Sequence, residues 1–561
     1  MKKNKTKINF IKKYIVNDKA SILDALKIIT SNQSKACVVI KNNKFFKVVT
    51  DGDIRRALIK GFSLDDKIVS VHNRESKYVY EIEIKKNKNY LFNSRFSIMP
   101  ILNSKNQLVD VITDNKSDLK YNIKKKKVAI IGLGYVGLTL ALVLSEKGFD
   151  VIGYDISKKT INKIKKGESP FFERYIDEYL NKNLNKNFRV TNNFNALNAD
   201  IYIICVGTPI DIKTKKPKID IISRAVQNIS KKIKNGDLLI LRSTLPTGFT
   251  RSNIIPIIEK HSKLKAGSGF LISFSLERTI EGKALDELSD LPQIIGGYDH
   301  ESTELSMKFF GAYSHTVIDV GSLEGAELCK LIDNSYRDVR FAYANHISLL
   351  CEELGLNAHD IISKVNLGYN RNDIAYPSPG VGGPCLSKDP YILQNNLIEN
   401  NINSSLLLNA RKINEIIPLK IYNRVLRLLK IHNKHKKNIK IFIIGFAFKG
   451  EPESSDMRDS TTLQFLSILK KNGFKNIYGY DPVIEKKEIN SLGIKYCDID
   501  MGFKNSNLVM FMNNHKSYSK INIIKLVNKM SQDSILYDGW NIYKSDIFKS
   551  VNNIKFIGIG K

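Results

Sequence analysis

A single cysteine, Cys385, stands in the stretch SPGVGGPCLSKDPYI (378–392), between a glycine-rich run and a Lys-Asp-Pro sequence. A cysteine thiolate can attack a carbonyl carbon and form a covalent intermediate, so this residue could be a nucleophile. An isolated cysteine is otherwise most often a small buried core residue. The flanking glycines and the charged pair Lys388-Asp389 are poor neighbours for a core position. The stretch therefore favours a nucleophilic role.

A glycine-rich loop is a second feature with a chemical use. Residues 127–155 read KVAIIGLGYVGLTLALVLSEKGFDVIGYD, which predicts a buried strand, a glycine turn, a helix and a second strand ending in an acid. The G-x-G-x-x-G pattern lets the backbone approach a pyrophosphate at the helix N-terminus. The final acid can bind an adenosine ribose and would repel a 2′-phosphate, which favours NAD over NADP. The residues expected at the cofactor are Gly132, Gly134, Tyr135, Val136, Gly137 and Asp155.

Two further strands are predicted to end near the same place. They are DIYIICVGTP (200–209) and DLLILRSTLPTG (237–248). Open parallel sheets bind ligands beyond the carboxyl ends of their strands. The residues that we therefore expect to face the cofactor are Thr208, Pro209, Ser243 and Thr244.

Lys330 and Asn334 could supply polar groups to the same site. They lie in GAELCKLIDNSYRDVRFAYANHISLLCEELG (325–355), which is long enough for one helix of nearly thirty residues. The i, i+4 spacing puts the two side chains on one face. Such a pair is usually plain helix surface, but its position between the dinucleotide fold and Cys385 favours a shared site. Apolar positions of this helix are Leu328, Leu331, Ile332, Val339, Ala342 and Leu350.

The first part of the chain contains an internal repeat. ACVVIKNNK (36–44) followed by VVTD (48–51) is echoed by SIMPILNSK (97–105) followed by VITD (111–114). Each copy predicts a strand, a polar turn and a second strand ending in Thr-Asp. In the first copy the helical sequence DIRRALIKG follows, and in the second it does not.

This repeat resembles a pair of CBS motifs, a Bateman module, over residues 10–118. In that family a Thr-Asp after the second strand often contacts the ribose of an adenine nucleotide, which implies a ligand site at Thr50 and Asp51. Asp51 could instead cap the following helix, and both interpretations stay open. The second copy is a weaker case for a site because it lacks the helix.

Length and composition limit the class of protein. A chain of 561 residues is too long for one core and suggests roughly three or four domains. No run approaches the roughly 18 apolar residues that would span a bilayer, so we expect no membrane partner. The basic start MKKNKTKINFIKK has no apolar segment behind it, so no secretory signal is expected and we predict a cytoplasmic protein.

The formal charge of +32 could indicate nucleic acid, a membrane surface or anionic substrates. Lysine is over-used throughout, and the Lys-rich runs 124–127 and 434–437 fall between periodic segments, so we interpret them as solvated linkers. No nucleic-acid motif is present, and we expect no such partner. The six cysteines form no C-x-x-C pair, which argues against a metal site and a disulfide framework.

A series of motifs occurs in order from residue 126 to the end: GLGYVGL, VGTP, STLPTG, ERTIEGKAL, ELCKLIDN, GVGGPCLSKDPYIL, GFAFKG and YDGWN. Together they resemble the UDP-glucose/GDP-mannose dehydrogenase family. The resemblance implies an α/β fold with two Rossmann-like doubly wound domains flanking a helical middle domain, here preceded by an α+β CBS pair. The implied boundaries are 1–120 for the CBS pair, 126–320 for NAD binding, 321–432 for the middle domain and 438–561 for UDP binding.

Members of this family oxidise the C6 alcohol of a nucleotide sugar to a carboxylate with two NAD. The second oxidation requires a group that adds to the aldehyde carbon, and the resemblance gives this role to Cys385. The thiol would form a thiohemiacetal, whose oxidation gives a thioester that water hydrolyses.

The resemblance also assigns roles around this cysteine. Lys330 would stabilise oxyanions by its charge and Asn334 by a hydrogen bond. Asp389 would orient water or relay the alcohol proton. Glu277 would be the general acid or base of thioester hydrolysis, with the water positioned by Thr244.

Further family positions imply binding roles. Glu281 would lie near the nicotinamide, and Arg458 would reach NAD either in its own subunit or across a subunit boundary. Three glycines would let the backbone wrap the sugar. The substrate set is Glu277, Arg278, Lys330, Asn334, Gly380, Gly382, Gly383, Phe448 and Lys449.

Three positions depart from the family pattern. Leu276 replaces a proline before the acid, and Trp540 stands where some members place a substrate-binding arginine. The family's basic residue after the ribose-binding acid has no clear equivalent.

The stretch ERTIEGKAL (277–285) resembles the UDP-N-acetylhexosamine branch more than the UDP-glucose branch. We therefore expect UDP-N-acetylglucosamine or UDP-N-acetylmannosamine as substrate, giving a uronic acid for surface polysaccharide. We also expect a homodimer or a higher homo-oligomer. Subunits would pair through the long helix, whose apolar stripe is too extensive for a small middle domain to cover.

Three alternatives stay open. The enzyme could be a UDP-glucose 6-dehydrogenase. It could be an adenine-nucleotide sensor on a degenerate dehydrogenase scaffold, although the complete set of catalytic positions speaks against this. A simple two-electron dehydrogenase of the hydroxyacid type would not need Cys385.

Overall fold

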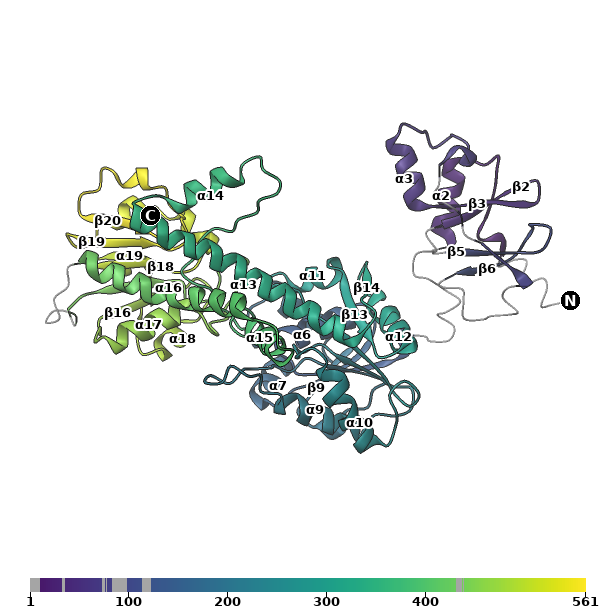
Figure 1. Cartoon of the computed structure of the whole chain (residues 1–561), viewed down its shortest axis with the longest axis horizontal. Helices are drawn as coiled ribbons and strands as arrows, with labels where there is room; N and C mark the ends of the chain where they lie inside the picture. The colour runs from purple at the N-terminus through teal and green to yellow at the C-terminus, as the bar shows by residue number, and fades with distance from the viewer. Residues whose placement is uncertain are drawn as a thin grey trace. The chain divides into compact units, whose positions relative to one another are not determined.

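The computed structural model describes residues 11–32, 36–72, 76, 78–82, 98–113, 123–429, 436 and 438–561. The chain divides into an N-terminal unit, Met1–Ile123, and a main unit, Lys124–Lys561, which are described separately (Figure 1). Ser97 and Asp114 of the second repeat lie outside the described residues, as does the Lys-rich run 434–437 except Lys436.

Two small sheets of the same topology make up the N-terminal unit. Their strand orders are β1-β2-β3 and β4-β5-β6, and in each the first pair is parallel and the second antiparallel. Both antiparallel pairs contain a register shift at an equivalent place. This equivalence confirms the predicted repeat. The strands are β1 (Ile15–Asn17), β2 (Ala36–Lys41), β3 (Lys44–Thr50), β4 (Val79–Tyr80), β5 (Ile98–Leu102) and β6 (Leu108–Thr113), with helix α2 (Ile22–Asn32).

The helix predicted after the first repeat is α3 (Asp51–Ile59). Its N-cap is Thr50, whose hydroxyl accepts a hydrogen bond from the Asp53 amide at 3.1 Å. The Asp53 carboxylate accepts one from the Thr50 amide at 2.9 Å, which completes a capping box. Asp51 forms an ion pair with Arg55 at 2.8 Å. The capping interpretation of Asp51 is therefore wrong, because Thr50 and Asp53 cap the helix.

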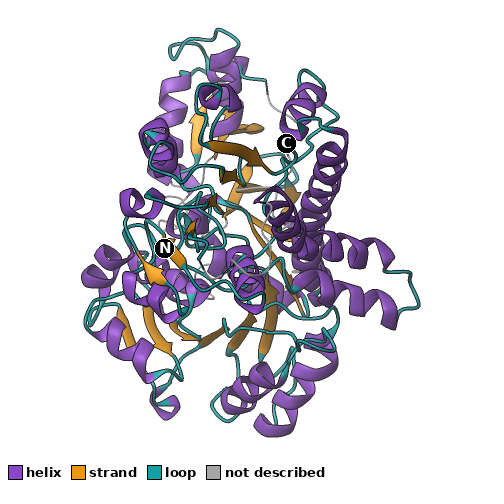
Figure 2. Ribbon diagram, turned by 90° about the vertical axis from the view of Figure 1, so that its left-hand side faces the viewer, coloured by secondary structure: helices purple, strands orange, loops and turns teal. Residues whose placement is uncertain are grey.

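An eight-stranded sheet with the order β14-β13-β12-β11-β10-β7-β8-β9 begins the main unit. All its pairs are parallel except β12 with β13, and helices flank the strands (Figure 2). Lys127 opens the first strand, and the preceding lysines are exposed or half-buried. The strands are β7 (Lys127–Ile131), β8 (Asp150–Tyr154), β9 (Phe188–Thr191), β10 (Ile201–Ile204), β11 (Leu238–Leu241), β12 (Leu271–Ser275), β13 (Gln293–Gly297) and β14 (Val317–Asp319).

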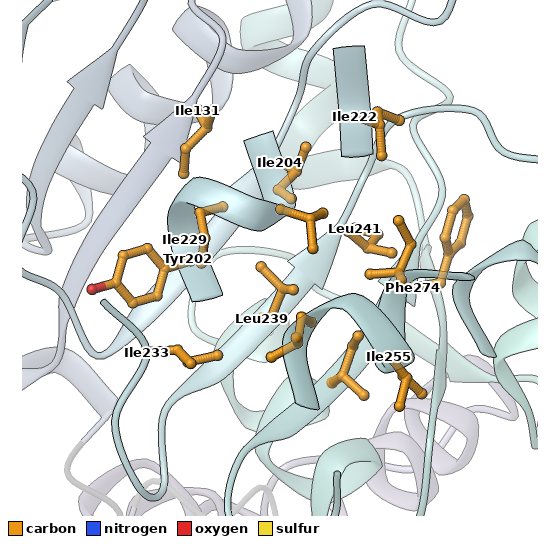
Figure 3. Packing of buried hydrophobic residues seen from close by; sticks show 14 of the residues in the cluster. Ile131, Tyr202, Ile204, Ile222, Ile229, Ile233, Leu239, Leu241, Ile255 and Phe274 are labelled. Carbon is orange, nitrogen blue, oxygen red and sulfur yellow. The ribbon is translucent and has the colours of Figure 1, made fainter. Parts of the chain in front are cut away.

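The core on one face of this sheet is built from aliphatic and aromatic residues of the central strands and from two helices. Figure 3 shows Tyr202, Leu239 and Phe274 of the strands against Ile229 and Ile255 of the helices. Burial of these side chains stabilises the sheet and so fixes where its strands end. The helices of this domain are α6 (Tyr135–Glu146), α7 (Lys158–Lys165), α8 (Ile176–Asn183), α9 (Asp220–Ser230), α10 (Ile255–Ser262), α11 (Ala284–Asp290) and α12 (His300–Gly311).

The predicted long helix is α13 (Leu323–Leu354), which runs from the first sheet to the C-terminal sheet (Figure 1). Its buried face is unusually polar, whereas several of its large apolar side chains are exposed. It packs against α15 (Asp389–Glu399) and α16 (Ser405–Leu429), and α14 (Ala358–Asn366) follows it.

A second, entirely parallel sheet closes the main unit, with the order β17-β16-β15-β18-β19-β20. The predicted α/β architecture of two such sheets around a helical middle is thus present. Among the described residues, no helix combines the length and the apolar character needed to cross a bilayer. The strands are β15 (Ile441–Ile444), β16 (Ile477–Tyr480), β17 (Lys495–Tyr496), β18 (Leu508–Phe511), β19 (Ser534–Asp538) and β20 (Ile554–Gly558), with helices α17 (Thr461–Lys471), α18 (Lys486–Ser491), α19 (Ile499–Phe503) and α20 (Ile523–Val527).

Candidate active site

Cys385 lies at the end of the glycine-rich loop that leads into α15. Its carbonyl accepts a hydrogen bond from the Asp389 amide at 2.9 Å, so the cysteine sits directly before the first turn of the helix. The residue is exposed, whereas Cys37 and Cys351 are buried. Solvent access combined with a position at a helix start is what a nucleophile requires, and it excludes the core packing role for Cys385.

Four charged or amide side chains lie around the start of α15, where this cysteine stands. Asn334 donates to Asp389 Oδ2 at 2.6 Å, and Lys388 forms an ion pair with the other carboxylate oxygen. Lys330, one turn before Asn334, is close enough to act on the thiol by its charge. The structure therefore brings together Cys385, Lys330, Asn334 and Asp389, which the sequence predicted as one site.

Burial and the neighbouring charges together determine the protonation state of the Cys385 thiol. Burial raises the pKa of the Cys385 thiol, because the surrounding protein atoms disfavour the charged thiolate. Part of the residue is nevertheless exposed to solvent. The Lys330 ammonium lowers that pKa, and the Asp389 carboxylate raises it. Since the net direction is upward from 9.0, the group is a thiol near neutral pH in this state.

Glu277, at the end of β12, is bound on both oxygens. Arg242 donates to Oε2 from Nη2 at 2.7 Å and from Nε at 3.0 Å, and the Thr279 amide donates to Oε1. Burial by itself would raise the pKa of Glu277, but the Arg242 guanidinium and the Thr279 groups lower it overall. Glu277 is therefore an ionised carboxylate, and its backbone carbonyl accepts a hydrogen bond from Lys330.

Sequence reasoning missed Arg242. The residue is buried and also donates to Ser275 and Gln293, so it ties the ends of β11, β12 and β13 together. A signal was available, because an arginine follows the wholly apolar strand Leu238–Leu241 directly. A charge at that point is buried, and it needs a partner that only the neighbouring strand can supply.

The loop after β12 also meets a loop of the C-terminal domain. Ser454 donates to Glu281 Oε2 at 3.0 Å, and Lys449 donates to the Glu281 carbonyl. Burial and the nearby Asp456 raise the pKa of Glu281 to about 7, and burial lowers the pKa of Lys449 to about 8. Arg458 binds the Asp456 carboxylate with both Nε and Nη2.

Arg458 also reaches the dinucleotide loop of its own chain. Its guanidinium carbon lies 6.0 Å from the centre of the Tyr135 ring, which itself stacks on Phe171 at 3.9 Å between centres. The same chain therefore places this arginine beside the start of α6. Its predicted contact to NAD fits that position.

The loop before α6 has the space that a dinucleotide requires. A Cβ built on Gly134 would meet nothing within 4 Å, whereas one on Gly137 would lie 1.8 Å from the Gly132 carbonyl oxygen. Gly132 has a φ of +96°, which favours glycine. Open backbone at the second glycine and close helix–strand packing at the third fit a bound pyrophosphate.

Asp155 follows β8 at the same edge of the sheet. Its carboxylate accepts hydrogen bonds from the Leu133 amide at 2.9 Å and the Ser157 amide at 2.8 Å. Two carboxylate oxygens have about four acceptor positions, so room for a ribose hydroxyl is left. These residues fit NAD.

The other predicted cofactor residues follow β10 and β11. Thr208 is buried and Pro209 is exposed. Ser243 donates to the Val206 carbonyl at 2.6 Å, which joins the two strand ends, and Thr244 is half-buried beside it. Val136 is half-buried in the first turn of α6.

The predicted substrate glycines meet protein atoms. A Cβ on Gly382 would lie 2.3 Å from the Asp459 carbonyl oxygen, and one on Gly383 would lie 2.7 Å from the Phe448 ring. Gly380 has a φ of +99°. Glycine is therefore required here for contact between the cysteine loop and the C-terminal domain, whatever its effect on the sugar.

Two residues singled out in the sequence have other partners. Arg278 donates to the Pro292 carbonyl at 2.7 Å, which directs its guanidinium to the start of β13. Trp540 donates from Nε1 to the Met512 carbonyl at 2.9 Å. The indole thus joins the ends of β18 and β19, and it is held by the backbone where some family members place an arginine.

Thr50 and Asp51 of the N-terminal unit lie at the start of α3, with the contacts described above. This unit also has a cavity of about 430 Å³, lined by Phe45, Phe46, Lys47, Val69, Ser70, Val71, His72, Ser76 and Tyr78. The two predicted ligand residues are not part of that lining.

Comparison with known families identifies three consecutive regions. Models of the UDP-glucose/GDP-mannose dehydrogenase family match residues 126–313 as the NAD binding domain, 324–416 as the central domain and 442–545 as the UDP binding domain. All three regions lie beyond residue 125, so the CBS pair stays a prediction, and so do the domain boundaries.

Individual proteins agree with this result. The chain is 32% identical over 448 residues to the UDP-N-acetyl-D-mannosamine dehydrogenase of Methanococcus vannielii, covering 78% of this chain and 98% of that one. It is 30% identical over 420 residues to the enzyme of the same name from Pyrococcus horikoshii, covering 74% and 96%.

Solved structures show the same similarity. The UDP-D-ManNAc dehydrogenase structure from Pyrococcus horikoshii superposes with a TM-score of 0.70 at 29% identity, covering 77% of this chain and 99% of that one. The UDP-N-acetyl-mannosamine dehydrogenase Cap5O of Staphylococcus aureus superposes with a TM-score of 0.66 at 27% identity, covering 77% and 98%.

Proposed function

This chain belongs to the UDP-glucose/GDP-mannose dehydrogenase family of NAD-dependent enzymes, and on that premise we propose that it oxidises a UDP-N-acetylhexosamine at C6. UDP-N-acetylmannosamine is our first choice of substrate, because several similar proteins carry that name. UDP-N-acetylglucosamine is the second. The product would be the corresponding uronic acid, used in surface polysaccharide and made in the cytoplasm.

The observation that carries this proposal is the exposed Cys385 beside Lys330 and the Asn334–Asp389 hydrogen bond. An oxidation that stops at the aldehyde needs no nucleophile. An oxidation that continues to the acid does, since the aldehyde carbon must first gain a substituent. A solvent-exposed thiol beside groups that can stabilise an oxyanion therefore supports the four-electron reaction over a two-electron one.

NAD, when bound at the glycine loop, supplies the hydride acceptor for each of the two oxidations. In the step between them, Sγ of Cys385 bonds to C6 and the thiol proton passes to the former carbonyl oxygen. The resulting thiohemiacetal loses two electrons and two protons in total and becomes a thioester. Water then breaks the C6–Sγ bond, which releases the carboxylic acid and restores the thiol.

The surrounding groups would assist these steps. Lys330 and Asn334 would stabilise the oxygen on C6 when it carries negative charge. Asp389 would take up the alcohol proton or orient water. Glu277 would act on the hydrolytic water that Thr244 positions, and the lowered pKa of Glu277 favours the role of general base over that of general acid.

The remaining predicted residues would bind the two ligands. The glycine loop, Asp155, Thr208, Ser243 and Arg458 would hold NAD, and Glu281 would lie near its nicotinamide. We propose that Phe448 and Lys449, which adjoin the cysteine loop, contact the UDP-sugar together with Arg278.

The decisive experiment measures NADH release with a panel of UDP-sugars and identifies the product by mass. We expect turnover with UDP-N-acetylmannosamine, two NADH per sugar and a carboxylate product. Turnover with UDP-glucose alone would favour the alternative UDP-glucose 6-dehydrogenase. An aldehyde product with one NADH would contradict the role of the cysteine.

A second proposal concerns assembly. Large apolar side chains are exposed along one side of α13, and we propose that a second copy of the chain covers them. The residues are Ile332, Tyr336, Tyr343, Leu350 and Leu354, which are between 51% and 62% exposed.

A third proposal keeps the adenine-nucleotide role of the N-terminal unit. It is supported by the repeat topology and by the place of Thr50 and Asp51 directly after the second strand of the first repeat, where a hydroxyl and a carboxylate can bind ribose hydroxyls. A nucleotide sensor on an inactive scaffold is disfavoured, because the predicted catalytic residues lie together in the main unit.

A further inference from the structure

Four polar residues are buried where α13 packs on α16. Arg411 and Asp338 form an ion pair at 2.5 Å, and each is only 1% exposed. Asn414 donates to the same Asp338 oxygen at 2.8 Å, and Asn345 donates to Asn414 at 2.9 Å. Nothing in the reaction described above uses these groups.

The Arg411 guanidinium also binds the backbone on both sides of Cys385. Nη1 donates to the carbonyl of Leu386 at 3.1 Å, and Nη2 donates to the carbonyl of Val381 at 3.3 Å. Leu386 directly follows the cysteine, and Val381 precedes it by four residues. A single rigid group thus spans the loop that carries the nucleophile.

The same polar cluster holds the start of this loop. The Ser378 amide donates to Asn345 Oδ1 at 2.9 Å. Asp338 lies on α13 at i+8 from Lys330 and at i+4 from Asn334, so one face of the helix carries both the groups beside the thiol and the anchor of the arginine. The loop and the groups around the thiol are therefore positioned from one helix.

We propose that Arg411, held by Asp338, is a positioning residue that sets the place of Cys385 relative to Lys330 and to the Asn334–Asp389 pair. This proposal rests on the proposed nucleophilic role of Cys385. Arg411 is buried and acts only through the backbone carbonyls of the loop.

The energetics favour a positional role over a stabilising one. Two charges buried between helices lose their hydration, and well-packed apolar residues of similar size are often equally stable. An apolar side chain could fill the same space between α13 and α16. It could not bind two carbonyls of the cysteine loop, since only a donor with fixed, divergent N–H groups does so.

The test replaces the pair together, as Asp338→Leu with Arg411→Met, so that no single charge is left buried. The control is Glu352→Leu with Arg424→Met, because Glu352 and Arg424 form a half-buried ion pair at 2.7 Å between the same two helices. In the control pair, the partners bind the C-terminal segment and not the cysteine loop.

We expect the Asp338/Arg411 double variant to fold, with a kcat for NADH release lowered by about tenfold to 10²-fold, because a nucleophile displaced by about 1 Å loses rate on that scale. The KM for NAD should change less than about twofold, since the dinucleotide loop is untouched. The control variant should keep kcat within about threefold of wild type. A kcat near wild type in the Asp338/Arg411 variant, or an equal loss in the control, overturns the proposal.

A measurement that needs no substrate turnover distinguishes a failure of this proposal from a failure of the proposed function. Alkylation of Cys385 by iodoacetamide, followed by peptide mass mapping, should slow by at least about threefold in the Asp338/Arg411 variant, because the thiol moves away from the Lys330 charge. Unchanged alkylation overturns the proposal, even if no UDP-sugar is turned over. If the double variant does not fold, Arg411→Lys is used, which keeps the charge but cannot bind both carbonyls, and the same outcomes apply.

Discussion

Asn334 on α13 donates a hydrogen bond to Asp389 at the start of α15, with 2.6 Å between Nδ2 and Oδ2. The Asp389 amide in turn binds the Cys385 carbonyl. Residues that are 51 and 55 positions away from Asn334 in the chain are thus connected to it by two hydrogen bonds. The proposed nucleophile and the proposed oxyanion-stabilising groups are thus connected, and changes to them should affect chemistry before they affect ligand binding.

Cys385→Ser should abolish carboxylate formation while it leaves NAD and UDP-sugar binding nearly intact. An alcohol is a much poorer nucleophile than a thiol near neutral pH, so acid production should fall by at least about 10³-fold. Product mass analysis and calorimetric titration of both ligands check this. Wild-type-like acid production by the variant would refute the covalent mechanism.

In the Arg242→Gln variant, the contribution of Glu277 to stability should change with pH in the direction opposite to that in the wild type. In the wild type the pKa of Glu277 is lowered, so its contribution to stability is present above its unfolded-state pKa and is lost as pH falls through the folded value. Without the guanidinium, burial raises that pKa, and stability is then lost as pH rises. The difference in Tm between variant and wild type should therefore be larger at about pH 8 than at about pH 4.5.

Ser275→Ala is the control for this experiment. It removes one hydrogen bond to Arg242 and leaves both charges in place. The difference in Tm between Ser275→Ala and wild type should be the same at both pH values. If Arg242→Gln also shows a constant difference, the ion pair does not control the ionisation of Glu277.

Asp155→Asn should narrow the preference for NAD over NADP. The Leu133 and Ser157 amides donate to different oxygens of Asp155, so asparagine keeps an acceptor for one of them and removes the charge that repels a 2′-phosphate. The ratio of kcat/KM with NAD to kcat/KM with NADP should fall by about tenfold or more, because a hydrogen bond to a charged group contributes a factor of about that size. An unchanged ratio would mean that Asp155 does not face the ribose.

Tyr343→Lys combined with Leu350→Lys should convert a dimer into a monomer. Both side chains are 55% exposed on α13. A lysine at either position would lose its hydration when a second copy of the chain covers this helix. Light scattering with wild type at micromolar concentration gives the reference. Met501→Lys, at another exposed apolar residue of the main unit, is the control and should stay dimeric. A monomeric wild type contradicts the proposal.

Removal of residues 1–120 should leave a folded enzyme that turns over. The main unit begins at Lys124, and the predicted catalytic residues all lie in it. If the N-terminal unit binds an adenine nucleotide, then AMP, ADP or ATP should change the rate of the full chain and not of the truncated one, with a coupling of about 1 to 3 kcal/mol. A full chain that binds none of these nucleotides leaves this unit without a regulatory role.

Local sequence determined the features that depend on neighbours along the chain. The glycine loop with its strand and helix, the long helix and the repeat all follow from short-range periodicity and backbone preference. The i, i+4 spacing of Lys330 and Asn334 put them on one face of a helix. The prediction that they share a site with Cys385 rested on their position between the dinucleotide fold and Cys385 and on the family resemblance. These features could be stated without coordinates.

Only the tertiary structure decided which charged groups pair. Arg242 meets Glu277 because β11 and β12 lie side by side, and Arg411 meets the cysteine loop because α16 packs on α13. Neither contact follows from spacing, since a buried charge is satisfied by whichever strand or helix packs against it. Asp51 shows the same limit at short range, because the identity of the helix cap depended on the backbone conformation at Thr50.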